Sequence, residues 1–163
     1  MATATFTAPA PPQAVGMAQI NAAQKPARLT AVLGSCVGVM MYHPRLHLGV
    51  MGHIVLPDSQ GRDAPPGKYA DTAIPHMLQL LEQRGAKRVG LVTKIAGGAC
   101  MFGTAGPLQI GEENVKAVLR ALDAAGLAVA CQDVAGSIGR RVTLCCDTGT
   151  VTVECVGRPP RTI

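Results

Sequence analysis

The sequence predicts one mixed α/β domain, a sandwich of largely antiparallel β-sheet with two main helices. Its predicted elements run strands, helix, strand, helix, strands, whereas a doubly wound parallel sheet would alternate strands and helices throughout. The chain has 163 residues and 48% of them are hydrophobic, enough for one domain with its own core. Only 2% are aromatic, so aliphatic side chains must build most of that core.

Three apolar runs open the folded part of the chain. Residues 29–33, 37–42 and 46–56 are rich in Val, Leu and Met, which is typical of buried strands. Gly34 and Ser35 break the chain between the first two runs, and a His-Pro pair separates the second from the third. We therefore expect the second and third runs to form an antiparallel pair.

Two amphipathic helices are predicted. The first begins after a cap at Asp71 or Thr72 and runs to about Arg84, and the second begins near Gly111 and ends at Gly126. Apolar residues recur in each at i, i+3, i+4 and i+7, which gives one buried stripe. The stripes consist of Ile74, Met77, Leu78 and Leu81 in the first helix and Val115, Val118, Leu119 and Leu122 in the second.

The remaining strands lie between and after the helices. Residues 89–95 form a strand between them, and residues 127–134, 140–146 and 150–156 form an all-β C-terminal third. The last two strands are joined by a three-residue loop in which Gly149 can adopt the left-handed conformation. A β-hairpin is therefore predicted at this point.

The N-terminal segment differs in composition from the rest. Residues 1–20 are rich in Ala, Pro, Thr and Gln and carry no charged side chain. Such a segment has little apolar surface to bury, so we predict a disordered leader. The folded domain is predicted to span residues 21–163.

Composition excludes several classes of partner. The net charge of +5 is scattered and accompanied by almost no aromatic surface, so nucleic-acid binding is not expected. No apolar run reaches the roughly 18 residues that a membrane span needs, and no signal-peptide pattern is visible. We expect a cytoplasmic protein without membrane insertion, and its six cysteines reduced.

No metal or cofactor is predicted either. The cysteines form no Cys-x2-Cys pair at zinc-binding spacing. Gly97 and Gly98 belong to no glycine pattern of a nucleotide-binding loop, so we expect them to allow close packing near the functional site instead.

A possible thiol-based site lies near the first turn. Cys36 follows Gly34 and Ser35, a turn whose amide N–H groups could stabilise an oxyanion. His53 could take the thiol proton, and the Thr30 hydroxyl could orient the imidazole. From these residues alone, a buried cysteine and a strand threonine without a catalytic role explain the pattern better, and a hydrogen-bonded core histidine explains it at least as well.

Several segments resemble the CheD family of chemoreceptor glutamine deamidases. Thr30 stands six residues before Cys36 in the Leu-Gly-Ser-Cys-Val segment 33–37, and His53 stands seventeen residues after it. Further segments resemble family signatures in the same order, and the resemblance extends over roughly residues 15–157. These are residues 68–75 (KYADTAIP), 94–102 (KIAGGACMF), 110–115 (IGEENV) and 136–140 (GSIGR).

The resemblance implies a function and a site. Cys36 would be the nucleophile, His53 the general base and acid, and Thr30 the residue that orients His53, with Gly34 and Ser35 supporting the turn and the oxyanion. The implied reaction converts receptor glutamine to glutamate through a cysteine thioester, with release of ammonia and without a metal or cofactor. The implied fold is similar to that of bacterial toxin deamidases.

Partners and alternatives also follow from the resemblance. Chemoreceptor cytoplasmic helices are the expected substrate, a CheC-type phosphatase is a further expected partner, and Tyr69 and Phe102 are candidate contacts with either. We expect a monomer. A non-catalytic docking regulator is the alternative function, and a papain-type protease is a weaker one because that class has a longer chain and a larger Cys-to-His separation.

Overall fold

The computed structural model describes residues 8–102 and 109–163 and shows two five-stranded sheets packed face to face. The first sheet contains, in spatial order, β1 (Gln13–Ala14), β3 (Arg28–Leu33), β8 (Arg140–Cys145), β9 (Val151–Glu154) and β10 (Arg161–Thr162). The second contains β2 (Ile20–Gln24), β5 (Leu48–Ile54), β4 (Val37–His43), β6 (Val92–Gly97) and β7 (Val129–Val134).

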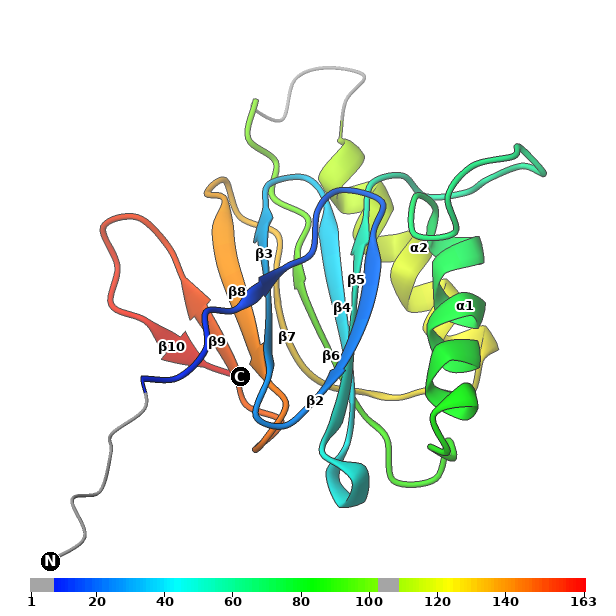
Figure 1. Cartoon of the computed structure of the whole chain (residues 1–163). Helices are drawn as coiled ribbons and strands as arrows, with labels where there is room; N and C mark the ends of the chain where they lie inside the picture. The colour runs from blue at the N-terminus through cyan, green and yellow to red at the C-terminus, as the bar shows by residue number, and fades with distance from the viewer. Residues whose placement is uncertain (1–7, 103–108) are drawn as a thin grey trace, which may run out of the picture.

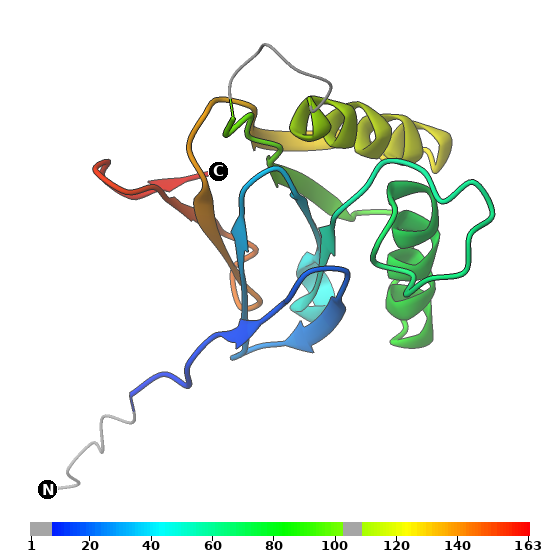
Figure 2. The same cartoon turned by 90° about the horizontal axis from the view of Figure 1, so that it is seen from above.

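Two helices cover the outer face of the second sheet. Helices α1 (Ala70–Gln83) and α2 (Ile110–Ala124) lie on the side of that sheet away from β8 and β9 (Figures 1 and 2). The parallel pairs are β1–β3 and β6–β7, and the other strand pairs of the two sheets are antiparallel. The predicted mixed α/β sandwich with two helices is confirmed.

The second sheet is buried on both faces because it lies between the helices and the first sheet. Every residue of β4 and β5 is buried. Alternate residues of these strands face two separate apolar layers. Val39 and Val50 pack toward the helices, whereas Met40 and Met51 pack toward the first sheet. The predicted apolar stripe of α1 completes the helical layer.

The structure differs from the predicted leader within its described part. β1 lies within the predicted leader and pairs with β3 at the edge of the first sheet. β2 begins at Ile20, where the predicted leader ends, and pairs with β5 at the edge of the second sheet. Main-chain pairing holds these short strands, which have little apolar periodicity for a sequence pattern to reveal. Residues 1–7 lie outside the described part.

Strand register brings the predicted site residues to one end of the second sheet. β4 and β5 are joined by a short 3₁₀ helix (Pro44–Leu46), and Gly38 lies directly opposite His53 in their ladder. Cys36 stands just before β4, at the same end. None of the helices in the described ranges is both long and apolar enough to cross a membrane.

Candidate active site

The candidate nucleophile lies in a bend between β3 and β4. Residues 34–36 form this bend, and the Gly98 N–H donates a hydrogen bond of 2.8 Å to the Cys36 carbonyl. Gly97 adopts φ +104°, and a Cβ there would lie 2.3 Å from the same carbonyl oxygen. The end of β6 therefore packs directly on the bend, which confirms the predicted close packing at Gly97 and Gly98.

The Cys36 side chain is 9% exposed and packs in the layer between the two sheets. Burial raises the pKa of the Cys36 thiol, because the thiolate loses solvation. The thiol is therefore protonated at neutral pH. Since the thiolate is the nucleophilic form, attack by Cys36 requires a base that removes its proton.

His53 is 4% exposed and has one firmly held ring nitrogen. Its Nδ1 lies 2.9 Å from the Val15 carbonyl oxygen. Because a carbonyl only accepts, Nδ1 carries the proton, and Nε2 of the neutral ring holds the free lone pair. Burial lowers the pKa of His53, and the bond to Val15 opposes that shift only in part. The ring is thus a neutral base at pH 7.

Cys36 and His53 face the same interior layer. Cys36 is two residues before Gly38, which lies opposite His53, so the two side chains occupy diagonal positions on one face. Gly38 places no side chain between them. Within the described ranges the Cys36 Sγ and the His53 ring share no hydrogen bond, as is common for catalytic pairs without substrate.

Thr30 reaches His53 through the main chain of Val15. The Thr30 hydroxyl donates to the Val142 carbonyl at 2.9 Å and lies 3.1 Å from Thr143 Oγ1. Its carbonyl oxygen accepts from Val15 N–H at 2.8 Å, and Val15 in turn accepts from His53. Direct orientation of His53 by the Thr30 hydroxyl therefore stays a prediction.

A surface groove of about 810 Å³ opens beside these residues. Its lining includes His53, Thr30, Met17 and Val32, the last two with largely exposed apolar side chains. An extended side chain of a partner protein could enter here and reach the imidazole. Cys36 is not among the described residues that line this groove, so the groove opens on the His53 side of the candidate site.

The two aromatic candidates for partner contact have opposite environments. Phe102 is 95% exposed, and its neighbour Met101 lies over Gly34, at the start of the nucleophile bend. Tyr69 is 3% exposed, directly precedes α1 and has the charged groups of Arg62 and Lys68 over its ring. Phe102 is thus free for contact near the site, whereas Tyr69 is held within the fold.

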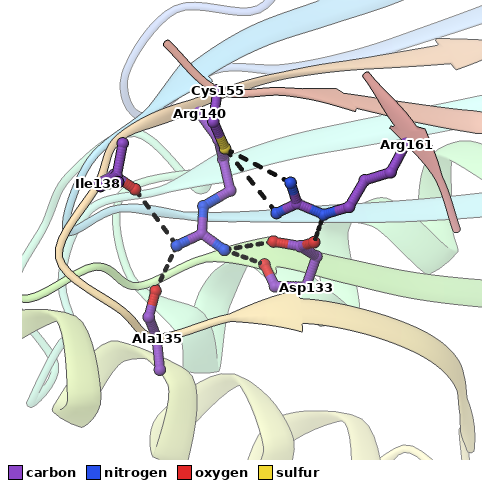
Figure 3. Close-up of polar contacts among 6 residues, drawn as sticks. All are labelled: Asp133, Ala135, Ile138, Arg140, Cys155 and Arg161. Carbon is purple, nitrogen blue, oxygen red and sulfur yellow. Dashed lines mark hydrogen bonds and ion pairs between the residues drawn. The ribbon is translucent and has the colours of Figure 1, made fainter. Parts of the chain in front are cut away.

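A second, partly buried polar cluster joins the two sheets. Asp133 of β7 accepts from Arg140 of β8 and from Arg161 of β10, with N···O distances of 2.5 Å to each (Figure 3). Hydrogen bonds from Arg161 and Arg140 hold the pKa of Asp133 below its usual range. The carbonyls of Ala135 and Ile138 accept from Arg140 as well. This cluster ties β7 to the opposite sheet.

Two contributors to the site were not predicted from the sequence. Val15 acts through its carbonyl, which every residue type carries, so no side-chain pattern could reveal it. Asn114 donates to the carbonyls of Ser35 and Val55 from α2. Here a signal existed, because Asn114 is a polar residue four positions before Val118 on the apolar stripe.

In residues 8–102 and 109–163, no group of three or more His, Cys, Asp or Glu side chains is arranged to hold a metal ion. A buried thiol, a neutral histidine with a fixed tautomer and a groove beside that histidine are features that a thiol-dependent hydrolase would require.

Comparison with known proteins identifies the family. Residues 55–155 match the family described as CheD chemotactic sensory transduction. The chain is 43% identical over 129 residues to "Chemoreceptor glutamine deamidase CheD" of Thermotoga maritima, covering 79% of this chain and 82% of that one. The chain belongs to the CheD family.

Two further relatives agree with this result. The "Probable chemoreceptor glutamine deamidase CheD" of Symbiobacterium thermophilum is 42% identical over 154 residues, 90% of this chain and 93% of its own. The protein of the same name from Methanococcus vannielii is 40% identical over 142 residues, which cover 86% of this chain and 92% of its own. The solved structure of Bacillus licheniformis YfiH is similar only at a TM-score of 0.41 and 14% identity, over 70% of this chain and 49% of its own, too slight to support an inference.

Proposed function

We propose that this chain hydrolyses the side-chain amide of specific chemoreceptor glutamines to glutamate, with release of ammonia, during chemotactic adaptation. The names of its relatives support the substrate, and family membership supports the activity. The hydrogen bond from His53 Nδ1 to Val15 carries the chemical part of the proposal. It leaves a neutral Nε2 available as a base on the face that Cys36 occupies.

The first half of the reaction forms a thioester. His53 Nε2 takes the proton of the Cys36 thiol as Sγ attacks the amide carbon of the glutamine side chain. Because both groups are neutral at rest, proton transfer accompanies attack and no preformed ion pair is needed. The imidazolium then gives the proton to the leaving nitrogen, which departs as ammonia.

The bend at residues 34–36 supplies donors for the oxyanion. Among the described residues, the amide N–H groups of Ser35 and Cys36 donate to no main-chain carbonyl. These groups adjoin the sulfur and are available for the negative oxygen of the tetrahedral intermediate. Gly34 and Ser35 thus act through the backbone that they shape.

The second half of the reaction restores the enzyme. His53 Nε2 accepts a proton from water, the resulting hydroxide attacks the thioester carbon, and the thiol of Cys36 leaves with that proton. The product is a receptor glutamate. A neutral side chain becomes anionic, which changes the electrostatics of the receptor helices.

The receptor is proposed to approach along the groove beside His53. The protein has a net charge of +5, so the field favours association with an acidic partner. Phe102 is exposed and Met101 lies over Gly34, so these two side chains are proposed as contacts for an approaching helix. Tyr69 would contribute by holding the segment before α1, since its ring is buried.

Docking without catalysis is the alternative, and a CheC-type phosphatase is a further proposed partner. A regulator that only docks has no need of a buried base with a fixed tautomer, so the His53 geometry favours the enzyme. For either partner, Phe102 is proposed as an exposed contact.

Ammonia release tests the proposal. The full chain is mixed with a chemoreceptor cytoplasmic fragment, beside a Cys36→Ala control. The expected result is ammonia from the native chain only, with a gain of about one dalton at particular glutamines, since cysteine is the nucleophile. Receptor binding without ammonia from either protein would favour the docking regulator.

A further inference from the structure

One side chain bridges the two halves of the candidate site. Asn114 of α2 is completely buried. Its Nδ2 donates to the Ser35 carbonyl at 3.0 Å and to the Val55 carbonyl at 2.9 Å. Since carbonyls only accept, the amide nitrogen must face both of them. Ser35 immediately precedes the nucleophile Cys36, and Val55 stands two residues after His53.

These two carbonyls lie where the ladder between β4 and β5 ends. The last pair is Val37 with Ile54, and the next position would join Cys36 to Val55. Backbone pairing does not continue there, because the chain bends away at residues 34–36. Asn114 supplies the link that ladder hydrogen bonds supply elsewhere along the two strands.

The fold holds α2 close enough for this contact. Gly111 lies one turn before Asn114, and a Cβ on it would be 2.5 Å from the Ala99 carbonyl oxygen. The helix therefore packs directly on the segment that follows Gly98, which itself donates to the Cys36 carbonyl. The Asn114 Oδ1 has no partner among the described residues. The contacts of this buried amide are therefore those of its nitrogen.

We infer that Asn114 is a positioning residue, which sets the placement of the Cys36 thiol relative to the His53 imidazole across the open end of the ladder. The inference rests on the proposed function for its catalytic meaning. Misplacement of reacting groups by about 1 Å can lower a rate about 100-fold. We therefore expect Asn114→Ala to lower kcat for deamidation about 100-fold, with KM changed less than about threefold.

Alkylation of Cys36 tests the inference without a receptor. The full chain reacts with iodoacetamide at pH 7, and peptide mass spectrometry follows Cys36 separately from the other cysteines. His53→Gln is expected to slow this reaction about tenfold in the native background, because the base is lost. In the Asn114→Ala background the same change should have less than a twofold effect.

Val118→Ala is the matched control. Val118 is buried on the same helix one turn later, so its truncation destabilises the fold without touching the bend. The control should retain the tenfold effect of His53→Gln. Should Asn114→Ala fail to fold, as judged by thermal unfolding, Asn114→Ser takes its place. In the Asn114→Ser background, His53→Gln should slow Cys36 alkylation less than about fivefold. The serine hydroxyl has one donor on a shorter side chain, so it cannot hold both carbonyls as the two N–H groups of Asn114 do.

The outcomes separate the inference from the proposed function. An undiminished His53 effect in the Asn114 variant would overturn the inference, as would an equal loss in Val118→Ala or no His53 effect in the native chain. If His53→Gln no longer slows Cys36 alkylation in the Asn114 variant, but still slows it in the Val118 variant, the inference is supported. If that His53 effect is lost in the Asn114 variant alone but the native chain releases no ammonia from the receptor fragment, the positioning role stands and the proposed function fails.

Discussion

Two polar clusters of this molecule, the Asp133 cluster and the Cys36–His53 pair, differ in which of their reactive atoms are paired. Both carboxylate oxygens of Asp133 meet a guanidinium nitrogen, from Arg140 and Arg161 respectively. In the described part of the chain, Cys36 Sγ and His53 Nε2 have no hydrogen-bond partner, although both side chains are buried. The paired carboxylate oxygens tie the two sheets together, although the Arg140 Nε of that cluster is buried without a partner among the residues that the structure describes. The unpaired Cys36 sulfur and His53 ring nitrogen are left available for a substrate.

Replacing the base should have the largest effect. His53→Gln keeps a donor for the Val15 carbonyl but lacks a basic nitrogen, so deamidation should fall about 10³-fold. The measurement is kcat for ammonia release with the receptor fragment. His43→Gln is the matched control, because His43 is a buried histidine at the far end of β4. Equal losses in the two variants would contradict the assignment of His53.

Breaking the paired cluster should affect stability instead. Asp133→Asn leaves Arg140 buried without its charge partner and should lower the free energy of unfolding by about 3 kcal/mol. Urea unfolding measures this, and kcat at low temperature should stay within about threefold of native because the cluster only supports the fold. The control is Asp147→Asn, which changes an exposed carboxylate 3.7 Å from His47 Nδ1. It is expected to change the free energy of unfolding by less than about 1 kcal/mol. If Asp133→Asn kept normal stability but lost activity, the Asp133 cluster would have a catalytic role instead of a structural one.

The acid limb of the pH profile reports the state of His53. Burial lowers its pKa, and the neutral ring is the base, so activity is complete above that pKa and is lost as the pH falls through it. We expect kcat/KM to fall about tenfold per pH unit, with a midpoint below about 6.5, the ordinary value for histidine. A midpoint above that value would mean that the protein stabilises the charged imidazolium, which would contradict His53 as a neutral base at rest.

Removing the Thr30 hydroxyl should have the smallest effect. Thr30→Val keeps the carbonyl that holds Val15 and removes only the hydroxyl bonded to Val142. We expect kcat to fall by no more than about tenfold, close to the result for Thr143→Val, since the main-chain link to His53 persists. A far larger loss for Thr30→Val alone would show that its hydroxyl orients His53 directly.

Periodicity made most of the fold predictable. The i, i+3, i+4 stripe of Ile74, Met77 and Leu78 identifies α1, and all three are buried. Gly149 adopts φ +76° in the loop between β8 and β9, as the hairpin prediction required. The short hairpin between β4 and β5 fixes their register, so the shared face of Cys36 and His53 was also within reach of the sequence.

The rest depended on main-chain contacts that side-chain patterns do not encode. β1 forms through edge pairing of a segment rich in small residues, for which composition indicated a leader instead. The acceptor for His53 is a carbonyl of that same segment, at Val15. Asn114 interrupts an apolar stripe, but which carbonyls it holds depends on how the helix packs on the sheet.

Detection of the thioester would test the central claim most directly. The native chain and the receptor fragment are mixed, quenched in acid within milliseconds, and analysed by mass spectrometry with peptide mapping. The account predicts a covalent adduct whose mass is the sum of both chains less one ammonia, attached at Cys36. Deamidated receptor formed without any such adduct, or an adduct at another cysteine, would contradict Cys36 as the nucleophile.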